Sequence, residues 1–150
     1  MNIHVEHIHA SKIVYMRRTG AYGEQNYKLM QNMKEWIHSH NLWNENSAVY
    51  GIAQDNAATT PPEQCRYDVC FVTDSSFNDT AVHHGELPSG AYLVFEIPHT
   101  AEEVGRFWDS IGEALQKEDK QIDESRPILE RYQIVLVEKG HCEFCVPIFL

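Results

Sequence analysis

The spacing of apolar residues changes along the first half of the chain in a strand–helix–strand–strand order. Residues 13–16 form a short apolar run typical of a strand, and a polar turn containing a glycine follows at 17–20. The segment 24–39 then predicts a helix, because apolar residues recur at spacings of three and four. These residues are Tyr27, Met30, Met33 and Ile37, with Leu29 and Trp36 beside them. Two more apolar runs, 48–53 and 65–73, predict strands on either side of a loop rich in turn formers.

The second half of the chain repeats this order. Residues 90–97 predict a strand, and Thr100 with Glu103 has the spacing of a capping box that begins a helix ending near Lys117. The apolar stripe of that helix contains Val104, Phe107, Trp108, Ile111 and Leu115. Runs at 128–137 and 142–149 predict the last two strands.

The repeated order predicts an α+β fold. We expect a single domain over 1–150, built from module 1 at about 1–79 and module 2 at about 80–150. The two modules would be related by a pseudo-twofold axis, with a central ligand cleft between them, since such junctions favour pockets. The alternative is ordinary α+β packing without a pocket.

The net charge of the chain narrows the classes of molecule that we expect it to bind. The 150 residues include 12 Lys and Arg against 22 Asp and Glu, for a net charge of −10. This balance disfavours direct nucleic-acid binding and anionic membrane surfaces, and it leaves neutral or cationic small molecules. No apolar run approaches the ~18–20 residues of a membrane-spanning helix, and no secretory pattern begins the chain, so we expect a cytoplasmic protein.

The cysteines and the short motifs indicate neither a metal nor a cofactor. Cys142 and Cys145 have the spacing of a metal-binding pair, but on a strand their side chains would point to opposite faces. Phosphate-binding loops, a nucleophile elbow and nucleotide fingerprints are absent from the sequence. Arg66 and Asp68, two residues apart, were expected to form a structural ion pair.

Six segments in order resemble the GyrI-like small-molecule-binding family, and the resemblance covers nearly the whole chain. They are RTGAY at 18–22, YGI at 50–52 with DN at 55–56 and TPPE at 60–63, CRYDVC at 65–70, LPSGAY at 87–92, RPILERY at 126–132 and EFCVPI at 143–148. The family includes effector-binding domains of AraC-type and MerR-type multidrug regulators, built from the strand–helix–strand–strand (SHS2) module. The chain departs from many members after the second helix, where LQKEDK at 115–120 replaces a Trp-Leu-Pro-like segment.

The resemblance implies that Glu130 recognises the ligand. In the family, an acidic residue at the matching position lies in an aromatic pocket and recognises cationic lipophilic compounds. Burial raises the pKa of a carboxyl group unless a cation compensates, and a cationic ligand would do so. Glu143 is a second candidate. The alternative for Glu130 is a surface position paired with Arg131 or Arg126.

Aromatic side chains would form the rest of this ligand-binding pocket. Tyr132 would share a strand face with Glu130 because strand side chains alternate. Trp108 lies on the apolar stripe of the second predicted helix, and Tyr92, Tyr22 and Phe71 lie in elements expected to border the cleft. Aromatic faces attract cations, which suits such a ligand.

We therefore predict a free-standing protein that binds lipophilic, cationic small molecules and uses no cofactor or metal. The sequence contains no helix-turn-helix region, so it resembles the free-standing branch of the family. One alternative, implied by the resemblance, is a hydrolase of strained cyclopropane-bearing electrophiles with Glu130 as its catalytic acid–base group. The other is a protein-interaction module that modulates a partner such as DNA gyrase.

Overall fold

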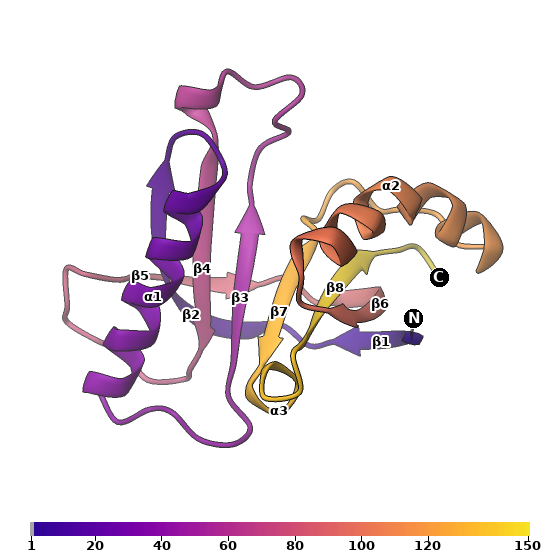
Figure 1. The fold of residues 1–150 in the computed structure, drawn as a ribbon. Helices are drawn as coiled ribbons and strands as arrows, with labels where there is room; N and C mark the ends of the chain where they lie inside the picture. Colours follow the sequence, from indigo (N-terminus) through magenta and orange to yellow (C-terminus); the bar gives the residue numbers. More distant parts are fainter. Residues whose placement is uncertain (1) are drawn as a thin grey trace.

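All strands pair antiparallel in one sheet, whose order is β1-β6-β8-β7-β3-β4-β2-β5 (Figure 1). The computed structural model describes residues 2–150. The strands are β1 (Asn2–Ile8), β2 (Ser11–Thr19), β3 (Ala48–Ala53), β4 (Arg66–Val72), β5 (His83–Leu87), β6 (Gly90–Pro98), β7 (Leu129–Gln133) and β8 (His141–Pro147). The helices are α1 (Glu24–Ser39), α2 (Ala101–Lys117), the short α3 (Ile134–Val137) and a 3-10 turn, η1 (Pro62–Gln64).

The α+β class is confirmed, and so is the order of elements along the chain. β2-α1-β3-β4 and β6-α2-β7-β8 are the two predicted strand–helix–strand–strand series. Both long helices have the predicted bounds, and the Thr100 hydroxyl caps α2 by accepting a hydrogen bond from the Glu103 N–H at 3.2 Å. Equivalent strands of the two series also stand at matching positions when the sheet is counted inward from its two edges: β6 and β2, β8 and β4, then β7 and β3. The pseudo-twofold axis itself stays a prediction.

Three elements differ from the prediction. The strands β1 and β5 were not predicted. Each pairs with a strand from the other half of the chain, since β1 pairs with β6 and β5 pairs with β2. Both are edge strands rich in histidine: β1 alternates only at Ile3 and Val5, and β5 has one large apolar residue, Leu87, so neither has an apolar pattern of the usual strand length. The run 134–137 was expected to extend a strand, but it forms α3, whose residues are all at least partly exposed.

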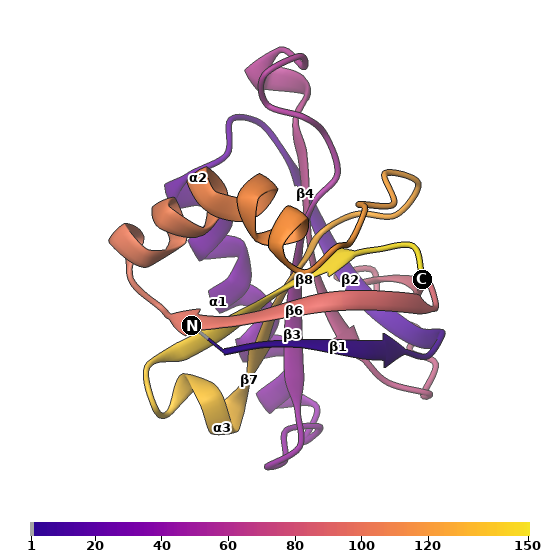
Figure 2. The ribbon, with the colours of Figure 1, turned by 90° about the vertical axis from the view of Figure 1, so that its right-hand side faces the viewer.

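The sheet curls into a half-barrel. Its strands turn from nearly vertical in β3 and β4 to nearly horizontal in β1 and β6 (Figures 1 and 2). A core of buried side chains from all eight strands fills the inner face, with Leu129 of β7 and Cys145 of β8 at its centre. The curl therefore gives the sheet two different faces, an inner face and a face that carries the helices.

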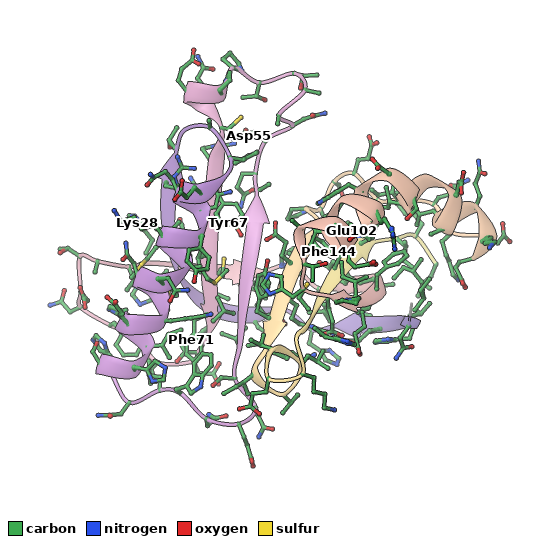
Figure 3. The ribbon with its side chains drawn as sticks, viewed as in Figure 1. Lys28, Asp55, Tyr67, Phe71, Glu102 and Phe144 are labelled. Atoms are coloured by element: carbon green, nitrogen blue, oxygen red, sulfur yellow. The ribbon has the colours of Figure 1, made fainter. Side chains whose placement is uncertain are left out.

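Both long helices cover the second, helix-bearing face. α1 packs Met33 and Ile37 against Val69 and neighbouring residues of β2, β3 and β4. α2 packs Phe107 against Phe95 of β6 and Phe144 of β8, with Phe107 and Phe144 stacked at 4.3 Å between ring centroids. Figure 3 shows Tyr67 on the half of the sheet under α1 and Phe144 on the half under α2. The paired strands β7 and β3 run along the seam between these halves.

Candidate functional site

Glu130 lies at this seam, on the helix-bearing face. It is in the middle of β7, where it pairs with Gly51 of β3 and Phe144 of β8. Its neighbours Leu129 and Arg131 point to the inner face because side chains alternate along a strand. Glu130 is partly buried rather than exposed, so it does not take the surface position of the alternative interpretation.

Two tyrosines hold one oxygen of the Glu130 carboxylate. The hydroxyls of Tyr67 and Tyr132 each donate a hydrogen bond to Oε1 at 2.9 Å. Within residues 2–150, Oε2 accepts no hydrogen bond and neither oxygen meets a cation. Burial raises the pKa of Glu130 above the ordinary value of 4.5, while the two tyrosine donors act in the opposite direction. The site thus holds a positioned carboxylate whose negative charge has no cationic partner among residues 2–150.

Gly51 provides the space in which Tyr67 reaches Glu130. A Cβ atom on Gly51 would lie 2.1 Å from the Tyr67 hydroxyl oxygen and 2.9 Å from Oε1 of Glu130. Any side chain at this position would therefore push the hydroxyl and the carboxylate away from their present positions. The glycine is needed for close approach, since its backbone is ordinary strand.

Two cavities adjoin the Glu130 carboxylate, and they share Asn26, Tyr67 and Glu130 as common wall. The larger has a volume of about 810 Å³ and the smaller about 250 Å³. The larger is also lined by Tyr22, Ala53, Gln54, Asp55, Asn56, Ala57, Trp108 and residues 124–128, and the smaller by Tyr27, Met30, Lys34, His99, Tyr132 and Val137. The larger cavity lies in the size range of small-molecule sites.

Four of the seven predicted site residues line these cavities. Glu130 belongs to both, Tyr22 and Trp108 belong to the larger, and Tyr132 belongs to the smaller. Trp108 is 46% exposed and touches Phe107 and Phe144 edge-on, so it forms an outer wall and not part of the core. The Tyr22 hydroxyl donates a 2.8 Å hydrogen bond to the carbonyl oxygen of Arg66, which fixes the ring at the cavity edge.

Phe71 and Tyr92 lie elsewhere. Phe71 is buried beneath α1, four residues along β4 from Tyr67, and it lines neither cavity. Tyr92 is 0% exposed on the inner face of the sheet, where the Arg126 guanidinium lies 4.7 Å from its ring centroid. Tyr92 is separated from Glu130 by the face on which it lies, whereas Phe71 shares the helix-bearing face but lies four residues further along β4 than Tyr67.

Glu143 also lies away from Glu130, in an ionic cluster on the inner face. Its carboxylate accepts hydrogen bonds from Arg131 at 2.9 and 3.1 Å and one from Gln133. Arg131 also donates to Glu6 of β1 at 2.6 and 2.9 Å, so it lies between two carboxylates. This arrangement leaves Glu143 outside both cavities, with its charge compensated inside the fold.

The arginines expected to pair with Glu130 or Asp68 have other partners in the structure. Arg126 pairs with Asp123 at 3.1 Å, and Arg131 pairs with Glu6 and Glu143, so neither neutralises Glu130. Arg66 and Asp68 do not pair: buried Asp68 lies opposite Arg17 of β2 and pairs with it, and Arg66 pairs with Asp55, which follows β3. Cys142 and Cys145 face opposite sides of the sheet.

Sequence reasoning missed Tyr67, which makes as short a hydrogen bond to Glu130 as Tyr132 does. It lies in the segment 65–70 that carried the family resemblance, on the same face of β4 as Phe71. The missing information was the strand order: β4 lies next to β3, and only a glycine of β3 separates Tyr67 from β7.

The chain belongs to the GyrI-like family. The model of the GyrI-like small molecule binding domain matches residues 1–148. A Bacillus subtilis (strain 168) protein, the "SPbeta prophage-derived putative transcriptional regulator YosT", is 38% identical over 150 residues, which cover 99% of each chain.

Solved structures share the fold. The C-terminal domain of EcmrR superposes with a TM-score of 0.73 at 10% identity, covering 99% of this chain and 97% of that domain. SAV2435 bound to tetraphenylphosphonium superposes with a TM-score of 0.63 at 17% identity, covering 99% of this chain and 94% of SAV2435. A small-molecule-binding domain is thus established by the family match. No helix among residues 2–150 has the length and hydropathy to cross a membrane.

Proposed function

We propose that the protein binds lipophilic organic cations in the cavities beside Glu130. The observation that carries this proposal is the carboxylate itself: it is partly buried, held by two tyrosines, and has no cation of its own among residues 2–150. Removing an ionised carboxylate from water is unfavourable, so a ligand cation at this place gains from compensating it. The SAV2435 complex supports this proposal, because its ligand, tetraphenylphosphonium, is a lipophilic cation.

Aromatic residues at the cavity walls suit the same ligand. Tyr22, Tyr67 and Trp108 line the larger cavity, and Tyr132 lines the smaller. Flat apolar groups pack on such rings, and a cation over a ring face gains about 0.5–2 kcal/mol. The positions of these residues, together with Glu130, favour a ligand that is both aromatic and positively charged.

The direct test is to compare two probes of the same shape and opposite charge, tetraphenylphosphonium and tetraphenylborate, by quenching of tryptophan fluorescence. Tetraphenylphosphonium should bind saturably, and Glu130→Gln should weaken it about tenfold or more, as expected for loss of one buried charge interaction worth at least ~1.4 kcal/mol. Glu113→Gln is the matched control, since Glu113 is exposed on α2 and lines neither cavity. Equal affinity for the two probes, or an unchanged affinity in Glu130→Gln, would contradict the proposal.

A hydrolase is the second candidate, favoured by the raised pKa of Glu130 beside a cavity of about 810 Å³. A carboxyl group held beside a cavity, with its pKa raised by burial, can act as a general acid or base toward a bound substrate. Water would add to a carbon of a strained cyclopropane, the ring C–C bond would break, and the electron pair would pass to the conjugated acceptor, which takes up a proton. Turnover of a cyclopropane-bearing alkylating agent that is lost in Glu130→Gln would establish this activity, and saturable binding without turnover would argue against it for that compound.

A protein-interaction role, such as modulation of DNA gyrase, stays a prediction from the resemblance. It predicts salt-sensitive association with a basic partner that Glu130→Gln does not change.

A further inference from the structure

The two cavities share the unpaired carboxylate of Glu130 but differ in the other unpaired charge that lines each of them. In the larger cavity Asp55 pairs with Arg66 and Arg126 pairs with Asp123, which leaves the carboxylates of Glu124 and Glu130 as the groups without an ion pair. In the smaller cavity the unpaired Glu130 is accompanied by an unpaired cation, Lys34 of α1. Lys34 is partly buried and makes no ion pair within 4.0 Å in the described part of the chain, 2–150, including none with Glu130.

The smaller cavity also presents hydrogen-bond donors. The Arg18 guanidinium donates to Oδ1 of Asn26 at 2.6 Å, and because arginine has no acceptor, this contact fixes the oxygen of the amide toward Arg18. The NH₂ group of Asn26 is therefore the part of that amide left for the cavity. His99 lines the same space, and burial followed by the neighbouring charge of Lys34 lowers its pKa. A neutral imidazole still keeps one N–H.

We propose that the smaller cavity is an anion subsite of the ligand site, so that the protein prefers zwitterionic aromatic amphiphiles to purely cationic ones. The ligand's cationic centre would lie against Glu130, its aromatic body in the larger cavity, and its carboxylate against Lys34 and Asn26. This inference rests on the proposed function, because the cationic end of such a ligand needs Glu130.

The unpaired charges of Lys34 and Glu130 explain the preference. Both charges line one cavity without contacting each other, so each loses some hydration without gaining an ion pair. A zwitterion compensates both groups. A purely cationic ligand compensates Glu130 but brings a second positive charge toward Lys34, which discriminates against it.

The experiment compares rhodamine 6G, a cationic ethyl ester, with rhodamine 19, its free carboxylic acid, by fluorescence anisotropy. The two dyes differ only at that carboxyl group. We expect the wild type to bind rhodamine 19 at least about threefold more tightly, and Lys34→Gln to remove this difference by weakening rhodamine 19 alone. Lys34→Arg should retain the preference. Lys28→Gln is the matched control, since Lys28 is exposed on the same helix and lines neither cavity.

The outcomes separate this inference from the proposed function. If rhodamine 6G binds and Glu130→Gln weakens it, but the ratio of the two affinities is the same in the wild type and Lys34→Gln, the anion subsite is refuted and cation binding stands. If neither dye binds, both the subsite and cation binding of such dyes are refuted. Equal effects of Lys34→Gln and Lys28→Gln would show a general charge effect and would also overturn the subsite.

Discussion

Glu130 and Glu143 lie one register position apart on neighbouring strands, yet the sheet gives their charges opposite surroundings. Glu143 faces the inner side, where Arg131 holds both of its oxygens and Gln133 adds a hydrogen bond. Glu130 faces the helices, where two tyrosine hydroxyls hold one oxygen and no cation of residues 2–150 contacts it. Glu143 is thus neutralised within the fold, whereas Glu130 has no cationic partner among the described residues.

Alternation along β7 produces this contrast. Arg131 is the residue next to Glu130, but it points to the opposite face and therefore reaches Glu6 and Glu143. Although Arg131 is adjacent to Glu130 in the sequence, its guanidinium lies on the opposite face of the sheet and does not contact Glu130. Changes on the inner face are therefore expected to affect stability, whereas changes beside Glu130 are expected to affect ligand binding as well.

The largest effect is expected from Arg131→Met on the inner face. Loss of the guanidinium leaves Glu143 as a buried charge without a cation, which typically costs about 3–5 kcal/mol. Denaturant-induced unfolding followed by circular dichroism measures this change. The control is the double variant Arg131→Met/Glu143→Leu, which removes both charges and should recover most of the loss. A single variant as stable as the wild type would show that the cluster does not stabilise the fold.

Gly51→Ala should act next most strongly, and it should affect the helix-bearing face. The new Cβ atom would collide with the Tyr67 hydroxyl and crowd Glu130, and such overpacking typically costs about 1–3 kcal/mol. Affinity for tetraphenylphosphonium should fall together with the free energy of unfolding.

The double variant Gly51→Ala/Tyr67→Phe tests the cause of this loss. It removes the hydroxyl that the Cβ would meet at 2.1 Å, so part of the lost stability should return. If the double variant loses as much stability as the two single variants together, or more, the collision lies elsewhere.

The sequence predicted those elements and site residues that depend on local pattern. α1 and α2 were predicted correctly because apolar spacing and the Thr100 cap are local signals. Tyr132 follows from Glu130 by alternation within one strand. β1 and β5 depend on pairing at the sheet edges, and their polar residues hide them.

The remaining site residues depend on contacts between strands far apart in the chain. Tyr67 reaches Glu130 across β3, 63 residues away in sequence, and no local pattern of β4 distinguishes it from Phe71. Glu143 was a reasonable candidate until its register with Arg131 was known. Alternation within β7 could therefore predict that Tyr132 lies beside Glu130, but the contacts of Tyr67 and Arg131, which cross between strands, could not be predicted.

The pH dependence of stability should have opposite sign on the two faces. Hydrogen bonds from Arg131 lower the pKa of Glu6 to about 2, so ionised Glu6 stabilises the fold above pH 4.5, and this contribution is lost as the pH falls toward 2. The pKa of Glu130 is raised, so its contribution is most favourable below pH 4.5 and is lost as the pH rises through the folded-state pKa.

Unfolding free energies of Glu6→Gln and Glu130→Gln between pH 3 and pH 8 measure this difference. Glu6→Gln should be less stable than the wild type at pH 7 and approach it in acid. Glu130→Gln should gain on the wild type as the pH rises, because an amide oxygen still accepts from both tyrosines without a buried charge. Glu113→Gln should show neither trend. Parallel curves for Glu6→Gln and Glu130→Gln would mean that the two faces do not differ in charge compensation.

The smallest effect is expected from Tyr67→Phe and Tyr132→Phe, which each remove one hydrogen bond to Oε1 of Glu130. A hydrogen bond to the ionised carboxylate favours its charged form, so loss of one donor should raise the pKa of Glu130 further above its ordinary value. Under the proposed function, binding of tetraphenylphosphonium depends on the ionised carboxylate, so its pH midpoint should move upward while the affinity on the alkaline side of that midpoint stays near the wild-type value. Tyr22→Phe is the control, because Tyr22 lines the larger cavity and donates to the backbone instead of to Glu130. A weaker affinity at every pH, without a moved midpoint, would show that the tyrosines act as walls of the cavity and not through the charge of Glu130.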